Sequence, residues 1–178
     1  FPGHGDTDVD SHYDLPKLGF TRQRLDELEI YPFKELIKQG ASAVMVGHMD
    51  IPALDNTPNL PSSISKKVVT DLLRNELGFK GLTVTDAMNM KGVTKFFPNG
   101  EADILAIEAG HDLLELSENS ARAIALVEKS IQSGRLKQAD IDARVKRILA
   151  AKLWLGLDKY APASRDRVFE DLNRPETK

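Results

Sequence analysis

Three short apolar segments alternate with amphipathic segments along the 178 residues of the chain. Residues 43–46, 81–85 and 113–116 each begin close to a glycine or an aspartate and are followed by polar residues. Such short apolar runs predict strands, and residues 43–46 are typical of a strand that is buried on both faces. Strands that alternate with helices in this way predict a parallel α/β sheet.

The segments between and around these strands have the periodicity of helices. Ser65 is a predicted N-cap, and the apolar residues from Val68 to Leu77 recur at the i, i+3, i+4 spacing of one helix face before Gly78 ends the helix. The same reasoning predicts helices at residues 22–28, 32–37, 102–109 and 121–131, and a last helix from about residue 141 towards residue 153.

The loops that follow the strands are long and polar, whereas the loops that precede them are short. This asymmetry is typical of a (β/α)8 TIM barrel, whose active site is built from the loops after the strands. A whole barrel has roughly 250 residues and eight strands. We therefore predict that residues 1–157 form about three β/α units, the C-terminal part of such a barrel. The start in a turn-rich segment and the polar end indicate an excised piece of a longer protein.

Composition argues against several kinds of partner. The formal charge is −3, and basic residues are scattered among acidic ones, so nothing resembles a nucleic-acid surface. No apolar run approaches the roughly 20 residues that cross a bilayer. There is no cysteine, which excludes disulfides and thiolate metal ligands. We expect no nucleic-acid partner and no membrane span.

The densest polar cluster lies at residues 4–12, and its acidic residues have two interpretations as metal ligands. The alternation of Asp6, Asp8 and Asp10 is that of a calcium-binding EF-hand loop, but the required glycine and glutamate would fall on Ser11 and Lys17. A transition-metal site from the histidines of the cluster lacks any fixed ligand spacing. The sequence predicts no metal site.

A third interpretation is a catalytic loop. Asp10 and His12 are close enough along the chain for the carboxylate to meet the imidazole across a tight turn, an arrangement that suits general acid/base catalysis. Acidic residues of this kind also simply cap turns, and the spacing alone leaves both roles open. Because the loop is rich in glycine, we expect it to be mobile and to bring His12 over a substrate on closure.

Polar side chains also follow two of the predicted strands. Asp86 comes directly after the predicted strand at residues 81–85, where a barrel presents catalytic groups, although an aspartate there can equally cap the next turn. His48 follows the strand at residues 43–46 and could bind substrate or shape its loop. Met90 could line an apolar floor or fill the core.

Together, residues 1–7 (FPGHGDT) and 10–12 (DSH) resemble the signature of the β-N-acetylglucosaminidase branch of glycoside hydrolase family 3. Residues 81–90 (GLTVTDAMNM) are similar to the family segment that carries the nucleophile. The resemblance extends to about Tyr160. It implies that residues 158–178 are a linker towards a following α/β domain.

The resemblance implies that Asp86 is the nucleophile, His12 the acid/base and Asp10 its orienting partner. We expect His4, His48 and Met90 to contact the sugar, with no cofactor and no metal. The expected partners are a carbohydrate substrate and the missing N-terminal half of the barrel, so the piece alone should be inactive.

The function implied is that of a bacterial, retaining, exo-acting β-N-acetylglucosaminidase (β-N-acetylhexosaminidase), which removes terminal N-acetylglucosamine from glycans such as peptidoglycan fragments through a covalent glycosyl-enzyme. The alternatives are a β-glucosidase, an N-acetylglucosamine phosphorylase and a non-catalytic carbohydrate-binding scaffold. The compartment stays open between the cytoplasm and a periplasmic or secreted location.

Overall fold

The computed structural model, which describes residues 1–162 and 165–177, contains a parallel three-stranded sheet in the order β1-β2-β3. The strands are β1 (Ala43–Val46), β2 (Leu82–Ala87) and β3 (Leu113–Glu115). Val44 lies opposite Thr83 and Val46 opposite Thr85, so β1 and β2 are in register along their shared length. The predicted α/β fold class is confirmed, and β2 extends to Ala87, two residues further than the strand predicted from sequence.

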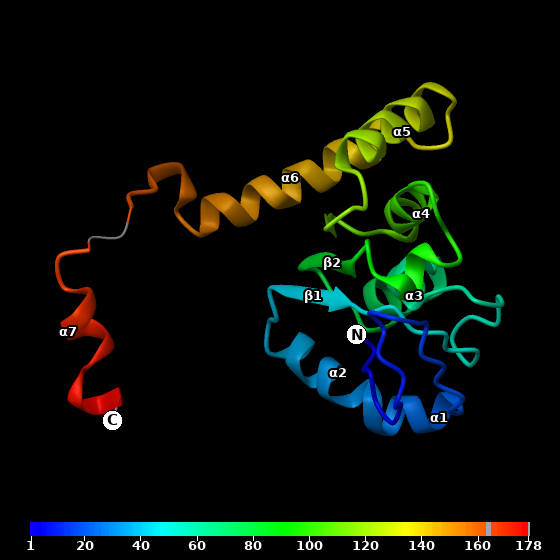
Figure 1. Cartoon of the computed structure of the whole chain (residues 1–178), viewed down its shortest axis with the longest axis horizontal. Helices are drawn as coiled ribbons and strands as arrows, with labels where there is room; N and C mark the ends of the chain where they lie inside the picture. Colours follow the sequence, from blue (N-terminus) through cyan, green and yellow to red (C-terminus); the bar gives the residue numbers. More distant parts are fainter. Residues whose placement is uncertain (163–164, 178) are drawn as a thin grey trace.

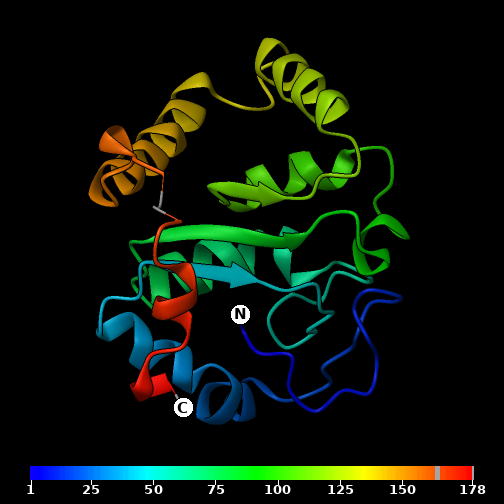
Figure 2. The same ribbon diagram turned by 60° about the vertical axis from the view of Figure 1, so that its left-hand side comes forward.

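Helical segments connect the strands and cover the sheet from one side. The helix η3 (Lys67–Glu76) connects β1 to β2 and lies behind the sheet in Figure 2. The helices α3 (Lys91–Thr94) and α4 (Glu101–Ala109) connect β2 to β3, and α4 ends at Gly110, whose φ of +116° suits glycine. Short α3 was not predicted, because four residues carry no helical periodicity.

The remaining elements lie before β1 and after β3, except η2, which lies between β1 and β2 (Figure 1). They are α1 (Arg22–Arg24), η1 (Leu25–Glu29), α2 (Tyr31–Lys38), η2 (Ser62–Ile64), α5 (Ser120–Gln132), α6 (Gln138–Trp154), η4 (Leu157–Lys159), α7 (Val168–Leu172) and η5 (Pro175–Thr177). The linker predicted for residues 158–178 thus contains short helical turns, and Ala163, Ser164 and Lys178 of that linker lie outside the described residues. No described helix has the length and apolar composition needed to cross a membrane.

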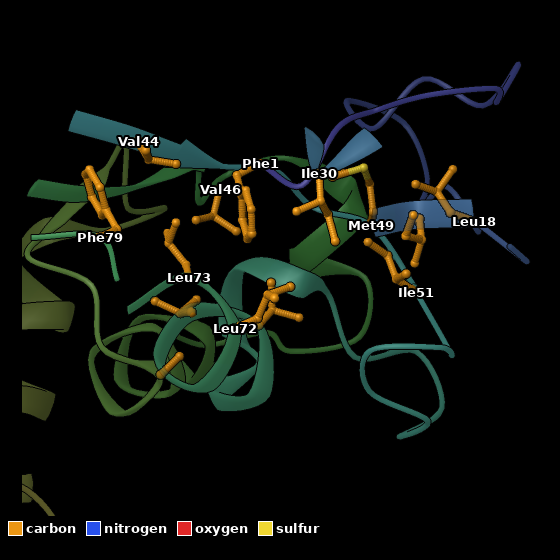
Figure 3. Packing of buried hydrophobic residues seen from close by; sticks show 14 residues of the cluster. Phe1, Leu18, Ile30, Val44, Val46, Met49, Ile51, Leu72, Leu73 and Phe79 are labelled. Atoms are coloured by element: carbon orange, nitrogen blue, oxygen red, sulfur yellow. The ribbon is translucent and has the colours of Figure 1, made fainter. Parts of the chain in front are cut away.

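The main core lies between the sheet and η3. Figure 3 shows Val44 and Val46 of β1 facing Leu72 and Leu73 of η3. Phe79 closes one end of this cluster and is almost fully buried. Apolar area removed from water is the main stabilising contribution in such a layer.

The opposite face of β1 is open, which corrects the prediction of a strand buried on both faces. The residues of β1 alternate between exposed and buried, and Met45 is 47% exposed. The physical reason is that the buried set, Val44 and Val46, already faces the helical layer, while Met45 projects from the other face of the strand. An apolar run of four residues does not distinguish one covered face from two.

A buried carboxylate joins β2 and β3 to two helices. Asp112, immediately before β3, accepts hydrogen bonds from the Thr83 backbone N–H at 3.0 Å and from Arg74 of η3 at 2.6 Å. Its other oxygen accepts from Arg147 of α6 at 2.8 Å. Burial raises the pKa of Asp112, but the Thr83 and Arg147 hydrogen bonds and the two guanidinium charges outweigh burial, and the pKa lies below its usual value.

Replacing Asp112 with alanine should therefore destabilise the chain strongly. The Asp112→Ala change leaves two guanidinium groups and a buried amide without their shared acceptor, and removal of one member of a buried ion pair costs about 3–5 kcal/mol. Urea unfolding of the chain measures the change. The control is Glu118→Ala, which removes the exposed pair with Arg122 and should change the free energy of unfolding by less than about 1 kcal/mol. Equal effects of the two changes would contradict the role of Asp112.

His111 is a second buried polar residue of the same region. It is 0% exposed, and its Nε2 donates to the Ser63 carbonyl at 2.7 Å. Burial lowers the pKa of His111 from 6.5 to about 4. The folded chain therefore holds His111 neutral at pH values at which an unfolded chain would already protonate it.

The free energy of unfolding should consequently fall as the pH drops from about 6.5 towards 4. The pKa of His111 is lower in the folded chain than in the unfolded chain, so the unfolded chain binds a proton first as the pH falls. The stability that neutral His111 contributes is complete above pH 6.5 and is lost on acidification. The difference between the two pKa values corresponds to about 3 kcal/mol of unfolding free energy. Urea unfolding at pH 7 and pH 4.5 tests this, with His111→Gln as the comparison, since glutamine has a donor but does not titrate. An unchanged pH dependence in His111→Gln would show that other groups cause the loss.

Candidate active site

The residues expected to carry chemistry gather at the carboxyl end of the sheet. Asp86 is near the end of β2, and His48 follows the end of β1. Phe1 lies beside β1, where its amino group donates to the Met45 carbonyl at 2.6 Å and its carbonyl accepts from the Gly47 N–H at 3.1 Å. Residues 2–20 therefore leave from the same edge of the sheet at which Asp86 stands.

Asp10 and His12 are in direct contact. Oδ1 of Asp10 accepts from the His12 backbone N–H at 2.9 Å and lies 2.7 Å from Nδ1 of the His12 ring. The backbone hydrogen bond, followed by the ring contact, lowers the pKa of Asp10. An ionised Asp10 fixes a proton on Nδ1 and leaves Nε2 free to take up or donate a proton. The side chains of both residues are largely exposed.

The loop that carries Asp10 and His12 is attached at several points. An isolated parallel bridge pairs Lys17 with Asp50, and Arg24 forms an ion pair with Asp6 at 3.1 Å. The His12 carbonyl accepts from the Lys91 N–H at 3.2 Å, which brings the Asp10–His12 turn beside the segment that follows Asp86.

Asp86 is partly buried at the end of β2. Its Oδ1 accepts from the N–H of Ala87 at 2.8 Å. This local hydrogen bond holds the carboxylate at the strand end. It is also the kind of turn-capping contact that the sequence left open as the alternative to a catalytic role.

His48 is buried and contacts the end of β2. It is 0% exposed; its Nδ1 lies 2.6 Å from the Ser63 hydroxyl and its Nε2 lies 3.0 Å from the Ala87 carbonyl. Burial lowers the pKa of His48, against opposing contributions from the Ala87 carbonyl and Asp86. Neutral His48 thus donates from Nε2 and accepts from Ser63. Of the two roles considered for His48, this geometry favours shaping the loop over hydrogen bonding to a substrate.

The other two expected sugar contacts differ in exposure. His4 is exposed on the loop, whereas Met90 is 5% exposed and offers little surface to a ligand. No group of three or more His, Cys, Asp or Glu residues within the described ranges is arranged to hold a metal ion. The structure also assigns contacts to Ser63, Asp14 and Lys95 that sequence reasoning missed, since isolated serines and surface charges carry no pattern.

Comparison with known proteins identifies the family. The family described as Glycosyl hydrolase family 3 N terminal domain matches residues 1–151. The chain belongs to glycosyl hydrolase family 3. Among curated family 3 relatives, Beta-hexosaminidase A of Pseudoalteromonas piscicida is 34% identical over 171 residues, which cover 85% of this chain and 29% of that protein. A Beta-N-acetylglucosaminidase/beta-glucosidase of Cellulomonas fimi is 30% identical and covers 89% of this chain and 30% of that protein.

Solved family 3 structures share the fold of this chain. A β-N-acetylglucosaminidase from Paenibacillus sp. str. FPU-7 superimposes with a TM-score of 0.88 at 40% identity, covering 94% of this chain and 32% of that one. A beta-glucoside phosphorylase superimposes with a TM-score of 0.90 at 25% identity and covers 99% of this chain and 34% of that one. The resemblance seen in the sequence is confirmed, and the chain spans about a third of the length of these family 3 relatives.

Proposed function

We propose that the protein containing this chain is a retaining, exo-acting β-N-acetylglucosaminidase in which Asp86 is the nucleophile and His12 carries the proton. The observation that supports this assignment best is the 2.7 Å contact between Asp10 and His12, on a turn hydrogen-bonded to the segment after Asp86. This arrangement would combine the strand-end carboxylate of Asp86 with His12 as general acid/base at one edge of the sheet. Retaining glycosidases require these two functions on opposite sides of the glycosidic bond.

The first half-reaction forms a covalent glycosyl-enzyme. A carboxylate oxygen of Asp86 attacks the anomeric carbon, and the bond between that carbon and the leaving oxygen breaks. Protonated His12 gives the proton on Nε2 to the leaving oxygen, so that the aglycone departs as a neutral alcohol. Asp10 keeps its hydrogen bond to Nδ1 and stabilises the imidazolium before transfer.

The second half-reaction returns the enzyme to its starting state. His12 takes a proton from a water molecule while the water oxygen attacks the anomeric carbon, and the bond to Asp86 breaks. The sugar leaves with the configuration it had in the substrate, since the carbon is inverted twice. A histidine suits this double role because its unperturbed pKa of about 6.5 permits both protonation states near neutrality.

The proposed substrate class follows the similarity to hexosaminidases. Beta-hexosaminidase A and the Paenibacillus β-N-acetylglucosaminidase match most of this chain. We therefore assign terminal β-linked N-acetylglucosamine, as in bacterial peptidoglycan fragments, to the whole protein. The Cellulomonas relative, which is also named a beta-glucosidase, makes β-glucosides the first competing class.

Phosphorolysis is a second candidate, and the similarity to a beta-glucoside phosphorylase favours it. Neutral His12 tolerates a nearby anion better than a second carboxylate would, so phosphate could replace water in the second half-reaction. Product analysis with and without inorganic phosphate distinguishes the two reactions. Sugar 1-phosphate indicates phosphorolysis, and free sugar at an unchanged rate indicates hydrolysis.

A slow fluorinated N-acetylglucosaminyl donor should label Asp86 covalently. The fluorine slows the second half-reaction, so the glycosyl-enzyme accumulates and mass spectrometry of the digested protein locates the added sugar. The natural protein that carries this segment is used, with Asp86→Asn as the unlabelled control. Label on another residue would overturn the nucleophile assignment, and binding of the donor without any label would favour the non-catalytic scaffold.

His12→Ala should slow substrates with poor leaving groups far more than substrates with good ones. General acid catalysis is worth roughly a hundred- to ten-thousandfold, and an activated aryl leaving group does not need a proton in the first half-reaction. Steady-state kcat/KM for a natural-type disaccharide and for a nitrophenyl glycoside measures the difference. Asp10→Asn should show the same selectivity at smaller magnitude. An equal loss for both substrates would exclude the acid/base role of His12.

A further inference from the structure

The short helix α3 lies against the turn that carries Asp10 and His12. The N–H of Gly92 donates to the Ser11 carbonyl at 3.2 Å, next to the bond between the Lys91 N–H and the His12 carbonyl. Immediately after α3, Nζ of Lys95 donates to both carboxylate oxygens of Asp14, at 2.8 and 2.9 Å. Two consecutive backbone carbonyls and one carboxylate of the loop are therefore held by α3 and the residue that follows it.

The backbones of α3 and the loop approach each other closely at Gly92. A Cβ atom at this position would lie 2.9 Å from the Ser11 carbonyl oxygen and 3.1 Å from that of Asp14. It would also lie 3.5 Å from Cβ of His48. Backbone oxygens cannot rotate away as a flexible side chain can, so any residue larger than glycine must displace the loop. Only glycine at position 92 therefore allows the loop to lie in its observed position against α3.

We propose that α3 is the docking element for the Asp10–His12 turn, with Lys95 and Gly92 as positioning residues for the proton carrier. This inference rests on the proposed function, because it assigns the dock to the His12 step. The helix follows Asp86 in the sequence after only four residues. A displacement of the turn from α3 thus changes the position of His12 relative to the nucleophile without changing either group.

The strength of the contact between α3 and the turn depends on how exposed its ion pair is to solvent. The side chains of Lys95 and Asp14 are each half exposed, so their attraction is screened by water and salt. Loss of this pair should lower kcat/KM for a poor-leaving-group substrate by about two- to fivefold, the range that exposed ion pairs support. Gly92→Ala should lower kcat/KM more, because the added Cβ acts directly on the loop backbone.

The test measures kcat and kcat/KM of Lys95→Ala and Gly92→Ala in the natural protein that carries this segment. A disaccharide and a nitrophenyl glycoside are compared, with azide added to the latter as a nucleophile that needs no general base. We expect the loss of kcat/KM to be larger for the disaccharide, and azide to restore kcat on the nitrophenyl substrate. A merely structural role would lower both substrates equally and would not respond to azide.

Matched controls separate docking from general effects of substitution. Lys129→Ala removes an exposed lysine from α5, and Gly19→Ala adds a Cβ where no atom lies within 4 Å. Both should keep wild-type kinetics. Lys95→Arg should retain the pair, and the exchanged pair Asp14→Lys with Lys95→Asp should recover most of the activity lost in Lys95→Ala. Failure of both rescues would overturn the role of the ion pair.

Amide hydrogen exchange makes the outcome independent of activity. Exchange in residues 8–15 should accelerate in Lys95→Ala and Gly92→Ala while the strands stay protected. Unchanged exchange and unchanged substrate selectivity would overturn the dock, provided that His12→Ala in the same protein shows the leaving-group effect. If His12→Ala lacks that effect while exchange still accelerates, the proposed function fails and the dock remains as a structural contact.

Discussion

The buried carboxylate of Asp112 is the contact on which the arrangement of this chain depends. It binds the Thr83 N–H of β2, Arg74 of η3 and Arg147 of α6 at once. Four elements from separate parts of the sequence are thereby fixed around one group that has no exposed side-chain surface. Because Thr83 is only three residues from Asp86, this contact also sets the height at which the strand presents the proposed nucleophile.

A second group of buried polar residues supports the end of β2. Ser63 contacts His48 through its hydroxyl and His111 through its carbonyl, and His48 in turn contacts the Ala87 carbonyl. Burial lowers the pKa of both histidines, so they act as neutral hydrogen-bonding groups near pH 7. The peptide beside Asp86 is therefore supported by an uncharged network. A positively charged His48 would attract the carboxylate of Asp86.

Much of this arrangement could be predicted from the sequence, because it follows from local patterns. Apolar runs and glycine stops were sufficient to predict the strands, and the position of Asp86 after one of them indicated a strand-end group. The burial of His48 was not predictable, since its two partners lie 15 and 39 residues away. The open face of β1 was missed for a related reason: burial depends on which elements pack on the sheet, and the residues of β1 do not encode that.

The two halves of the proposed site are held by different kinds of contact, and the chemistry explains the difference. A nucleophile needs one fixed position, and Asp86 stands on the central strand of the sheet, which pairs with β1 and β3. In the proposed reaction, the proton carrier serves a leaving alcohol and then an entering water, and the aglycone departs between the two events. The turn is held against α3 by two backbone hydrogen bonds and the half-exposed pair of Lys95 and Asp14, contacts that are weak enough for the proposed displacement. A fully buried contact between α3 and the turn would bind the turn more tightly but would oppose its displacement.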